Sequence, residues 1–438
     1  MIRRTALAAL AALTLALALA APARAELDIQ EVTSPGGITA WLVEDHNIPF
    51  TALEIQFRGG TSLDPADKRG AVNLMTALIE EGAGDLDSLG FAEARDALAA
   101  GFSFSSGTDS VGVSARFLTE NRDQAIDLLR SALVTPRFDD AALERVREQV
   151  LSNLRSDAKD PDAIAGQTFN ALAFGDHPYG SSGDGTLETV AALTRDDILA
   201  AHQGALARDR IYVAVAGDIT AAELGPLLDR LLGDLPATGT PLPTRAELLL
   251  TGGVTVVDFP TPQASVLFGH VGIAREDPDF FAAFILNEAM GGGRFTARLM
   301  SEIREKRGLT YGIGSYLYGL DQAELYLGQF SASSDKVAEA IAVLSAEWAR
   351  LASDGLTAEE LAATKTYLTG SYPLRFNGNG PIASILVGMQ MEGLPIDYAV
   401  TRNARIEAVT LEDTARVAKR VFLPEALHFV VVGEPSGL

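Results

Sequence analysis

The chain has 438 residues, no cysteine, 35 basic and 58 acidic residues, and a formal net charge of −23 at pH 7. This charge argues against nucleic acid and anionic membrane surfaces as partners, because both repel an acidic protein. Without cysteine there are no disulfide bonds and no Cys-ligated zinc sites, so the fold depends on its apolar core, and the length allows two or more domains. One interpretation of the acidity is that it keeps the protein soluble. The other is an acidic chamber that attracts basic, extended peptides.

The N-terminus has the features of a secretory signal peptide. Arg3-Arg4 precedes an Ala/Leu-rich run from Ala6 to Ala21, and Ala23-Arg24-Ala25 fits a cleavage site of small residues. The run is shorter than the roughly 20 apolar residues of a membrane span. No cysteine follows it that would carry a lipid anchor. We therefore expect residues 1–25 to be removed on export and the protein to be periplasmic in a Gram-negative bacterium.

Residues 70–84 read Gly-Ala-Val-Asn-Leu-Met-Thr-Ala-Leu-Ile-Glu-Glu-Gly-Ala-Gly, an apolar helical stretch that begins after Gly70 and ends at Gly82. It resembles the helix on which zinc peptidases of the pitrilysin and mitochondrial-processing-peptidase family, the inverzincins, carry His-x-x-Glu-His. That chemistry needs two imidazoles on one helix face and a Glu as general base for a zinc-bound water. The resemblance places Asn73, Thr76 and Ala77 at these positions, and none of them is a suitable ligand or base.

The third zinc ligand of that family is a Glu on a later helix, which corresponds here to Leu143–Arg155. The resemblance places the ligand position at Asn153 or its neighbour Ser152, and neither is a carboxylate. The histidines offer no replacement, because no two of them have ligand spacing; they are His46, His177, His202, His270 and His428. We therefore expect no zinc and no other cofactor in this chain.

The remainder of the chain contains an internal repeat. Leu193–Ile198 recurs as Val409–Thr414, and Phe138–Leu143 corresponds to Leu356–Leu361, at nearly equal offsets and in the same order. Three helix starts within these pairs have capping-box spacing, with Asp or Glu three residues after a Thr; the threonines are Thr194, Thr357 and Thr410. The repeat predicts two copies of one folding unit.

Each half has strand-like segments at its ends and helical segments between them. The expected helices include Asn121–Val134 and Asp335–Leu351, and the expected strands are Thr39–Glu44, Thr51–Phe57, Ile211–Asp218, Gly253–Asp258, Ala264–His270 and His428–Glu434. This order predicts an α+β fold of two homologous α/β-sandwich domains, each a mixed, mostly antiparallel sheet faced by helices. The expected boundaries are 26–235 for the N-terminal domain, 236–246 for a proline-containing linker, and 247–438 for the C-terminal domain.

The second half carries the most specific residues. A glycine-rich segment, Gly291–Leu299, leads into a charged helix and a strand, and Arg304 is followed seven residues later by Tyr311. This resembles the C-terminal motif of the same family, which implies that the pair positions the substrate backbone and stabilises the oxyanion. The alternative is structural, with Glu302–Arg307 as a solvated helix face and the tyrosine as an ordinary strand aromatic. The glycines lack the Lys-Ser/Thr of a phosphate-binding loop.

One further segment resembles the family, His177-Pro-Tyr-Gly180. We expect it to form a turn, with Tyr179 packed inward and no chemistry of its own.

The resemblance, from about residue 27 to 436, implies a non-catalytic, substrate-binding subunit of a heterodimeric zinc peptidase. A homologous partner would carry His-x-x-Glu-His and the zinc, while this chain would donate Arg304 and Tyr311 to peptide hydrolysis. Two alternatives remain open: a stand-alone peptide-binding or chaperone-like homodimer, and a scaffold subunit with no role in hydrolysis. A neighbouring gene for a homologue with an intact motif would distinguish them.

Overall fold

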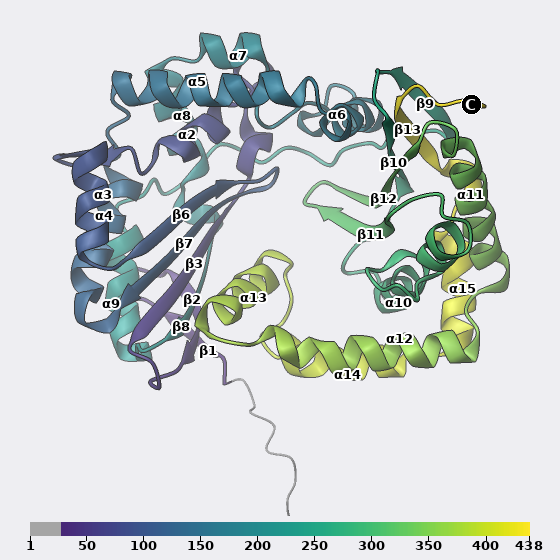
Figure 1. Ribbon diagram of the computed structural model, residues 1–438. Coiled ribbons are helices and arrows are strands. Elements are labelled where there is room, and N and C mark those ends of the chain that lie inside the picture. Colours follow the sequence, from purple (N-terminus) through teal and green to yellow (C-terminus); the bar gives the residue numbers. More distant parts are fainter. Residues whose placement is uncertain (1–27) are drawn as a thin grey trace, which may run out of the picture.

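Two sheets with matching strand order organise the protein (Figure 1). The computed structural model describes residues 28–438, so the predicted signal peptide lies outside the described residues. The first sheet has the order β1-β2-β8-β3-β7-β6 and the second β11-β12-β10-β13-β9. Without β1 and with the second sheet read from β9, the two orders match: β2-β8-β3-β7-β6 and β9-β13-β10-β12-β11. Each sheet has one parallel pair, β2–β8 and β9–β13, among antiparallel neighbours. The predicted α+β fold of two homologous halves is confirmed.

The first half comprises strands and helices up to the proline-containing linker. Its strands are β1 (Gln30–Thr33), β2 (Thr39–Glu44), β3 (Phe50–Arg58), β4 (Gly82–Ala83), β5 (Leu86–Asp87), β6 (Gly101–Ser106), β7 (Ser110–Leu118) and β8 (Ile211–Gly217). Its helices are α2 (Ala71–Leu78), α3 (Ser88–Ala97), α4 (Arg122–Val134), α5 (Asp140–Asp157), α6 (Pro161–Phe174), α7 (Leu187–Ala192), α8 (Arg195–Ala205) and α9 (Ala221–Leu232).

The second half repeats this plan. Its strands are β9 (Gly253–Asp258), β10 (Gln263–Val271), β11 (Ile313–Leu320), β12 (Ala323–Ser333) and β13 (His428–Gly433). Its helices are α10 (Phe280–Gly291), α11 (Val337–Asp354), α12 (Ala358–Ser371), α13 (Asn379–Met391), α14 (Tyr398–Ala408) and α15 (Leu411–Val421), with a π-helical turn over Met300–Glu305. None of the helices in residues 28–438 is long and apolar enough to cross a bilayer.

Local signals in the sequence explain several helix starts. Thr194, Thr357 and Thr410 each form a reciprocal capping box at the start of α8, α12 and α15, as their spacing predicts. The helix expected from Gly70 to Gly82 is shorter and ends at Leu78. Gly82 has a φ of 126°, a backbone angle that residues with a side chain rarely adopt, and there the chain turns into β4.

Each half covers one face of its sheet with its own helices and the other face with a helix of the opposite half. Helix α13 of the second half packs on β3 and β8, where Leu386 is buried beside Trp41 of β2. Reciprocally, α6 of the first half packs on β10 and β13, where Phe169 is buried. Figure 1 shows both helices reaching across to the other sheet. The two halves therefore share their cores.

A polar junction joins the halves at the tip of the β11–β12 hairpin. Arg58 pairs with Asp321 of this hairpin (3.1 Å), and the backbone N–H of Asp321 donates to Asp109 (2.9 Å). The Tyr179 hydroxyl donates to Asp109 (2.7 Å) and accepts from the backbone N–H of Gln322 (3.1 Å). Tyr179 is buried, as predicted, and its segment links three loops.

Candidate functional site

Helix α2 carries three of the four predicted degenerate ligand positions. Asn73 is half-buried and its side-chain oxygen accepts a hydrogen bond from Ser106 of β6 (2.9 Å). Thr76 is buried and donates its hydroxyl proton to the Val72 carbonyl of its own helix (2.8 Å). Ala77 is exposed. The Asn73 and Thr76 side chains are thus hydrogen-bonded within the first half, and Ala77 has no atom that could coordinate a metal.

The start of α2 is fixed by a buried carboxylate. Asp64 accepts hydrogen bonds from the backbone N–H groups of Gly70 (2.9 Å) and Val72 (3.0 Å), which lie in the first turn. Burial raises the pKa of Asp64 to about 6, although these hydrogen bonds and Arg69 act in the opposite direction. Arg69 in turn donates to the carbonyls of Thr61, Pro178 and Ser181.

The fourth position, Asn153, lies on α5, which packs against α2. Asn153 is exposed and accepts a hydrogen bond from Gln149 of the same helix (2.9 Å). Zinc needs imidazole, thiolate or carboxylate ligands. The side chains at the four positions do not fit this requirement, and residues 28–438 contain no group of three or more His, Asp or Glu arranged to hold a metal ion.

The histidines serve separate structural purposes. His202 and His270 are buried, and their ring nitrogens contact the carbonyls of Leu133 (2.9 Å) and Val271 (2.7 Å). His270 also accepts a hydrogen bond from Trp348 (3.1 Å), and burial lowers its pKa to about 4. His177 caps the turn before Tyr179 and contacts the carbonyl of Thr244, whereas His428 contacts Thr255 and the carbonyl of Thr251.

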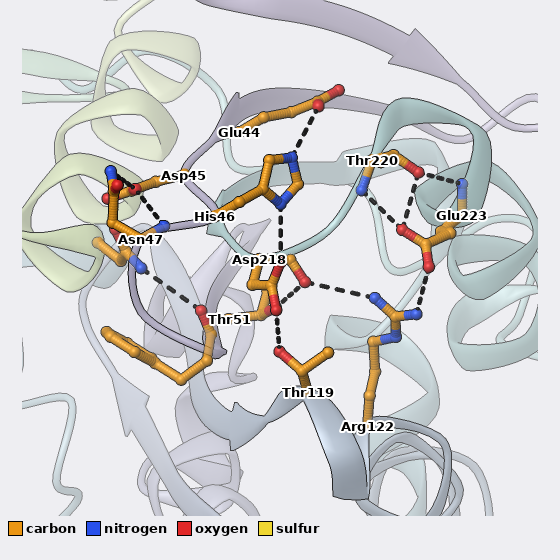
Figure 2. A network of polar contacts seen from close by, with 12 residues as sticks. Glu44, Asp45, His46, Asn47, Thr51, Thr119, Arg122, Asp218, Thr220 and Glu223 are labelled. Atoms are coloured by element: carbon orange, nitrogen blue, oxygen red, sulfur yellow. Dashed lines mark hydrogen bonds and ion pairs between the residues drawn. The ribbon is translucent and has the colours of Figure 1, made fainter.

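His46 belongs to a polar network at the end of the first sheet, where β2, β7, β8 and α9 meet (Figure 2). Its Nδ1 lies 2.7 Å from Asp218 and its Nε2 lies 3.3 Å from Glu44. Hydrogen bonds to Asp218 and Glu44 raise the pKa of His46, and a hydrogen bond from Thr119 lowers that of Asp218. Both ring nitrogens are engaged with carboxylates, so this network ties strand ends together.

Arg304 lies on the π-helical turn, a conformation that is rare and frequent at functional sites. The other arginines of this region are ion-paired: Arg294 with Glu288, Arg298 with Glu360 and Arg307 with Glu302. The Arg304 side chain forms no hydrogen bond or ion pair within the described chain, and its guanidinium stacks over exposed Phe295 at 4.7 Å. The helix that the sequence predicts over Glu302–Arg307 is in the structure a π turn, which spans Met300–Glu305.

Tyr311 stands just before β11 and is 83% exposed. Its hydroxyl has no hydrogen-bond partner among the described residues. An aromatic side chain in ordinary strand packing is covered on at least one face, and Tyr311 is not. Both members of the predicted pair therefore have free donor groups.

A groove extends from the glycine-rich segment to the junction between the halves. Two adjoining pockets of about 530 and 300 Å³ form it, and they share Asp162, Ser265, Tyr316 and Gln329. One end is lined by Gly291, Gly293 and Gly312, the residue after Tyr311; the other end is lined by Tyr179 and Tyr318. Its walls are the face of β10–β12–β11 and helix α6.

Polar groups in the groove are partly desolvated. Tyr316 and Tyr318 meet edge to face at 6.2 Å, and burial raises the pKa of both phenols, with Asp109 adding to the effect at Tyr318. The Ser265 hydroxyl donates to Asp162 of α6. The groove thus presents neutral hydroxyl groups beside one carboxylate and apolar ring faces, a surface suited to a polar chain with side chains to pack.

The structure does not bring the two predicted sets together. Helix α2 packs on α5, α8 and β6 in the first half, whereas the Arg304 turn packs on α11 and β11 in the second. Sequence reasoning missed the groove, because Asp162 and Ser265 carry no motif and meet only when α6 crosses to the second sheet. Tyr316 lies in the segment that follows Tyr311, but no motif marks it as part of a groove shared with α6.

Two domain models of one family match the chain: the insulinase, peptidase family M16, domain over residues 40–186, and the peptidase M16 inactive domain over residues 192–368. The chain belongs to the peptidase M16 family.

Particular relatives share most of its length. A protein of Helicobacter pylori named non-peptidase homolog YmxG is 26% identical over 371 residues, covering 84% of this chain and 86% of that protein. An uncharacterized zinc protease of Streptomyces coelicolor is 25% identical over 403 residues, covering 90% and 87%. The crystal structure of a peptidase M16 inactive domain from Pseudomonas fluorescens has a TM-score of 0.87 at 25% identity, covering 94% and 98%. A protease structure from Helicobacter pylori shares the fold, with a TM-score of 0.84 at 17% identity. An M16 chain without zinc ligands at these positions fits a non-catalytic role.

Proposed function

We propose that this protein is the non-catalytic, substrate-binding subunit of a heterodimeric periplasmic zinc peptidase. A homologous partner with His-x-x-Glu-His holds the zinc, and this chain supplies Arg304 and Tyr311 to that site during peptide hydrolysis. The predicted signal peptide supports the periplasmic setting, and the name of the Helicobacter pylori relative, non-peptidase homolog, supports the division of labour.

One observation carries this proposal: the ligand positions hold side chains unsuited to zinc, while Arg304 and Tyr311 keep donors that nothing in the described chain engages. Every neighbouring arginine is ion-paired, so the freedom of Arg304 is specific to its position. A fixed cation and a neutral O–H donor suit the stabilisation of negative charge on a carbonyl oxygen. A scaffold has no use for this pair.

The groove supports peptide as the substrate class. It leads away from Tyr311 along the face of the second sheet and offers the hydroxyl groups of Tyr316 and Tyr318 with their ring faces. An extended peptide presents alternating side chains and backbone polar groups, which match apolar ring faces and hydroxyl groups respectively. In this proposal the reacting bond lies at the end of the groove next to Tyr311, where Gly312 is part of the lining.

The test is a reconstituted complex of this chain with its homologue that carries His-x-x-Glu-His. Arg304→Ala and Tyr311→Phe should each lower kcat by about 10²–10³, the loss seen when one oxyanion donor is removed. Arg307→Ala is the matched control, because Arg307 is close in sequence but ion-paired to Glu302. Assembly and the zinc content of the partner should be unchanged in all three variants. Wild-type cleavage rates in both Arg304→Ala and Tyr311→Phe complexes would favour the scaffold alternative.

A further inference from the structure

The two halves differ at one sheet edge. Glu44 of β2 and Asp258 of β9 each lie opposite the glycine that ends the parallel partner strand, so the two strands correspond residue for residue. By this match Leu42 in the first half is equivalent to Val256 in the second, and Ala40 is equivalent to Val254. Ala40 and Leu42 are 0% exposed, whereas Val254 and Val256 are 43% and 46% exposed. Equivalent apolar positions are thus buried in one half and open in the other.

Two elements cover the edge in the first half. Strand β1 pairs antiparallel with β2, with Val32 opposite Ala40, and helix α9 packs beside β1. Within the described residues, β9 pairs with β13 only, and nothing corresponds to β1 or α9 along its outer edge. The segment that precedes β9 lies elsewhere, since the N–H of Ala246 donates to Gln322 and that of Leu249 to Ala173.

The free edge of β9 is ready for another strand. The N–H of Gly253 points toward β13, where it donates to the Leu427 carbonyl. Because backbone directions alternate along a strand, the N–H and C=O groups of Val254, Val256 and Asp258 point to the open side. No proline or lysine interrupts Gly253–Asp258, although such residues usually protect an exposed edge.

We propose that a second copy of this chain covers the edge, with β9 pairing antiparallel to β9 about a two-fold axis at Val256. This pairing places Val256 opposite Val256 and Val254 opposite Asp258, so a valine cluster forms at the axis. The two Asp258 carboxylates lie at opposite ends of the pairing, roughly 14 Å apart at strand spacing, beyond the Debye length at physiological salt. The strand can therefore pair with its own copy without bringing the two Asp258 carboxylates together.

The interface lies apart from the groove. In the second sheet β9 and β11 are opposite edges, and the groove runs along β11 and its neighbours. A dimer through β9 leaves Arg304 and Tyr311 free for a peptidase partner, so it is independent of the proposed peptidase role and joins two such complexes into one assembly.

The absence of native cysteine makes cross-linking a direct test, because a single introduced thiol is unique. In the proposed pairing the Val256 Cα atoms are about 5.5 Å apart, within the range that a disulfide bridges, whereas the Val254 Cα atoms are too far apart. Under mild oxidation the purified Val256→Cys chain should form a covalent dimer, and the matched Val254→Cys chain should not. In sedimentation the wild-type chain should be a dimer and the Val256→Lys variant a monomer. The circular dichroism spectrum of the variant should be unchanged.

The outcomes separate the possible occupants. A wild-type dimer, Val256→Cys cross-linking and Val256→Lys dissociation together support the pairing. A wild-type chain that stays monomeric, equal cross-linking of both cysteine variants, or cross-linking of Val256→Cys only to a different protein would overturn it. None of these readouts uses a peptidase partner or a substrate, so failure here leaves the proposed peptidase role untouched.

Discussion

Replacement of Leu386 by alanine tests whether the exchange of α6 and α13 makes the two halves one folding unit. Leu386 belongs to the second half but is buried against the first sheet, with none of its surface exposed. Truncation of a buried Leu to Ala costs about 2–5 kcal/mol, from lost transfer free energy and the cavity that remains. Because unfolding of either half strips a helix from the sheet of the other, this cost should fall on both halves.

The protein has two tryptophans, and each reports on a different half. Trp41 of β2 lies in the cluster under α13, and Trp348 of α11 lies in the core of the second half. Trp41→Phe and Trp348→Phe leave one reporter each, and urea unfolding is followed by fluorescence. In both backgrounds Leu386→Ala should lower the free energy of unfolding by the same amount, in a single transition.

Phe169→Ala in α6 is the reciprocal control, because Phe169 belongs to the first half and is buried against the second sheet. It should cost about 3–5 kcal/mol and shift both reporters together. A Leu386→Ala variant in which only the Trp41 transition moves would refute the reasoning, since the halves would then unfold independently.

Two further predictions concern buried titratable groups. The pKa of His270 is lowered to about 4, below the 6.5 of an unfolded histidine, so its stabilising contribution is complete above pH 6.5 and lost as the pH falls toward 4. Between pH 7 and 4 the free energy of unfolding of wild type should therefore fall by about 3 kcal/mol more than that of His270→Gln, as measured by urea titrations. Parallel pH profiles of the two proteins would contradict this. Asp64→Ala removes the acceptor for the first turn of α2 and should cost about 1–2 kcal/mol at pH 7, with faster amide exchange at Gly70 and Val72. Asp64→Asn keeps an acceptor and should lose less than half as much; equal losses would show that the cap is not the cause.

Much of the fold was predictable because its signals are local. The strands Thr39–Glu44 and Gly253–Asp258 have the predicted bounds, and the threonine caps begin α8, α12 and α15 as their spacing indicates. Near-equal offsets between repeated segments predicted the duplication, and the shared strand order bears it out.

The rest depends on contacts between residues far apart in sequence. An apolar helix such as α13 shows that it must be buried, but its sequence does not specify which sheet it covers. The groove has the same origin, because Asp162 and Ser265 meet only through the crossing of α6. The π turn at Arg304 was also not predictable, since such turns are rare and occur inside helices, so a helical pattern in the sequence does not mark them.

The junction at Tyr179 has a consequence for how the groove admits a chain. One wall of the groove is α6 and the other is the β11–β12 hairpin, and Tyr179, Asp109 and Arg58 tie the hairpin tip to the first half. Helix α6 is itself fixed by its packing on β10 and β13, where Phe169 is buried. These contacts therefore hold the two walls of the groove together at the hairpin tip. If the groove binds peptide as proposed, walls held at one separation favour a single extended segment over a folded domain.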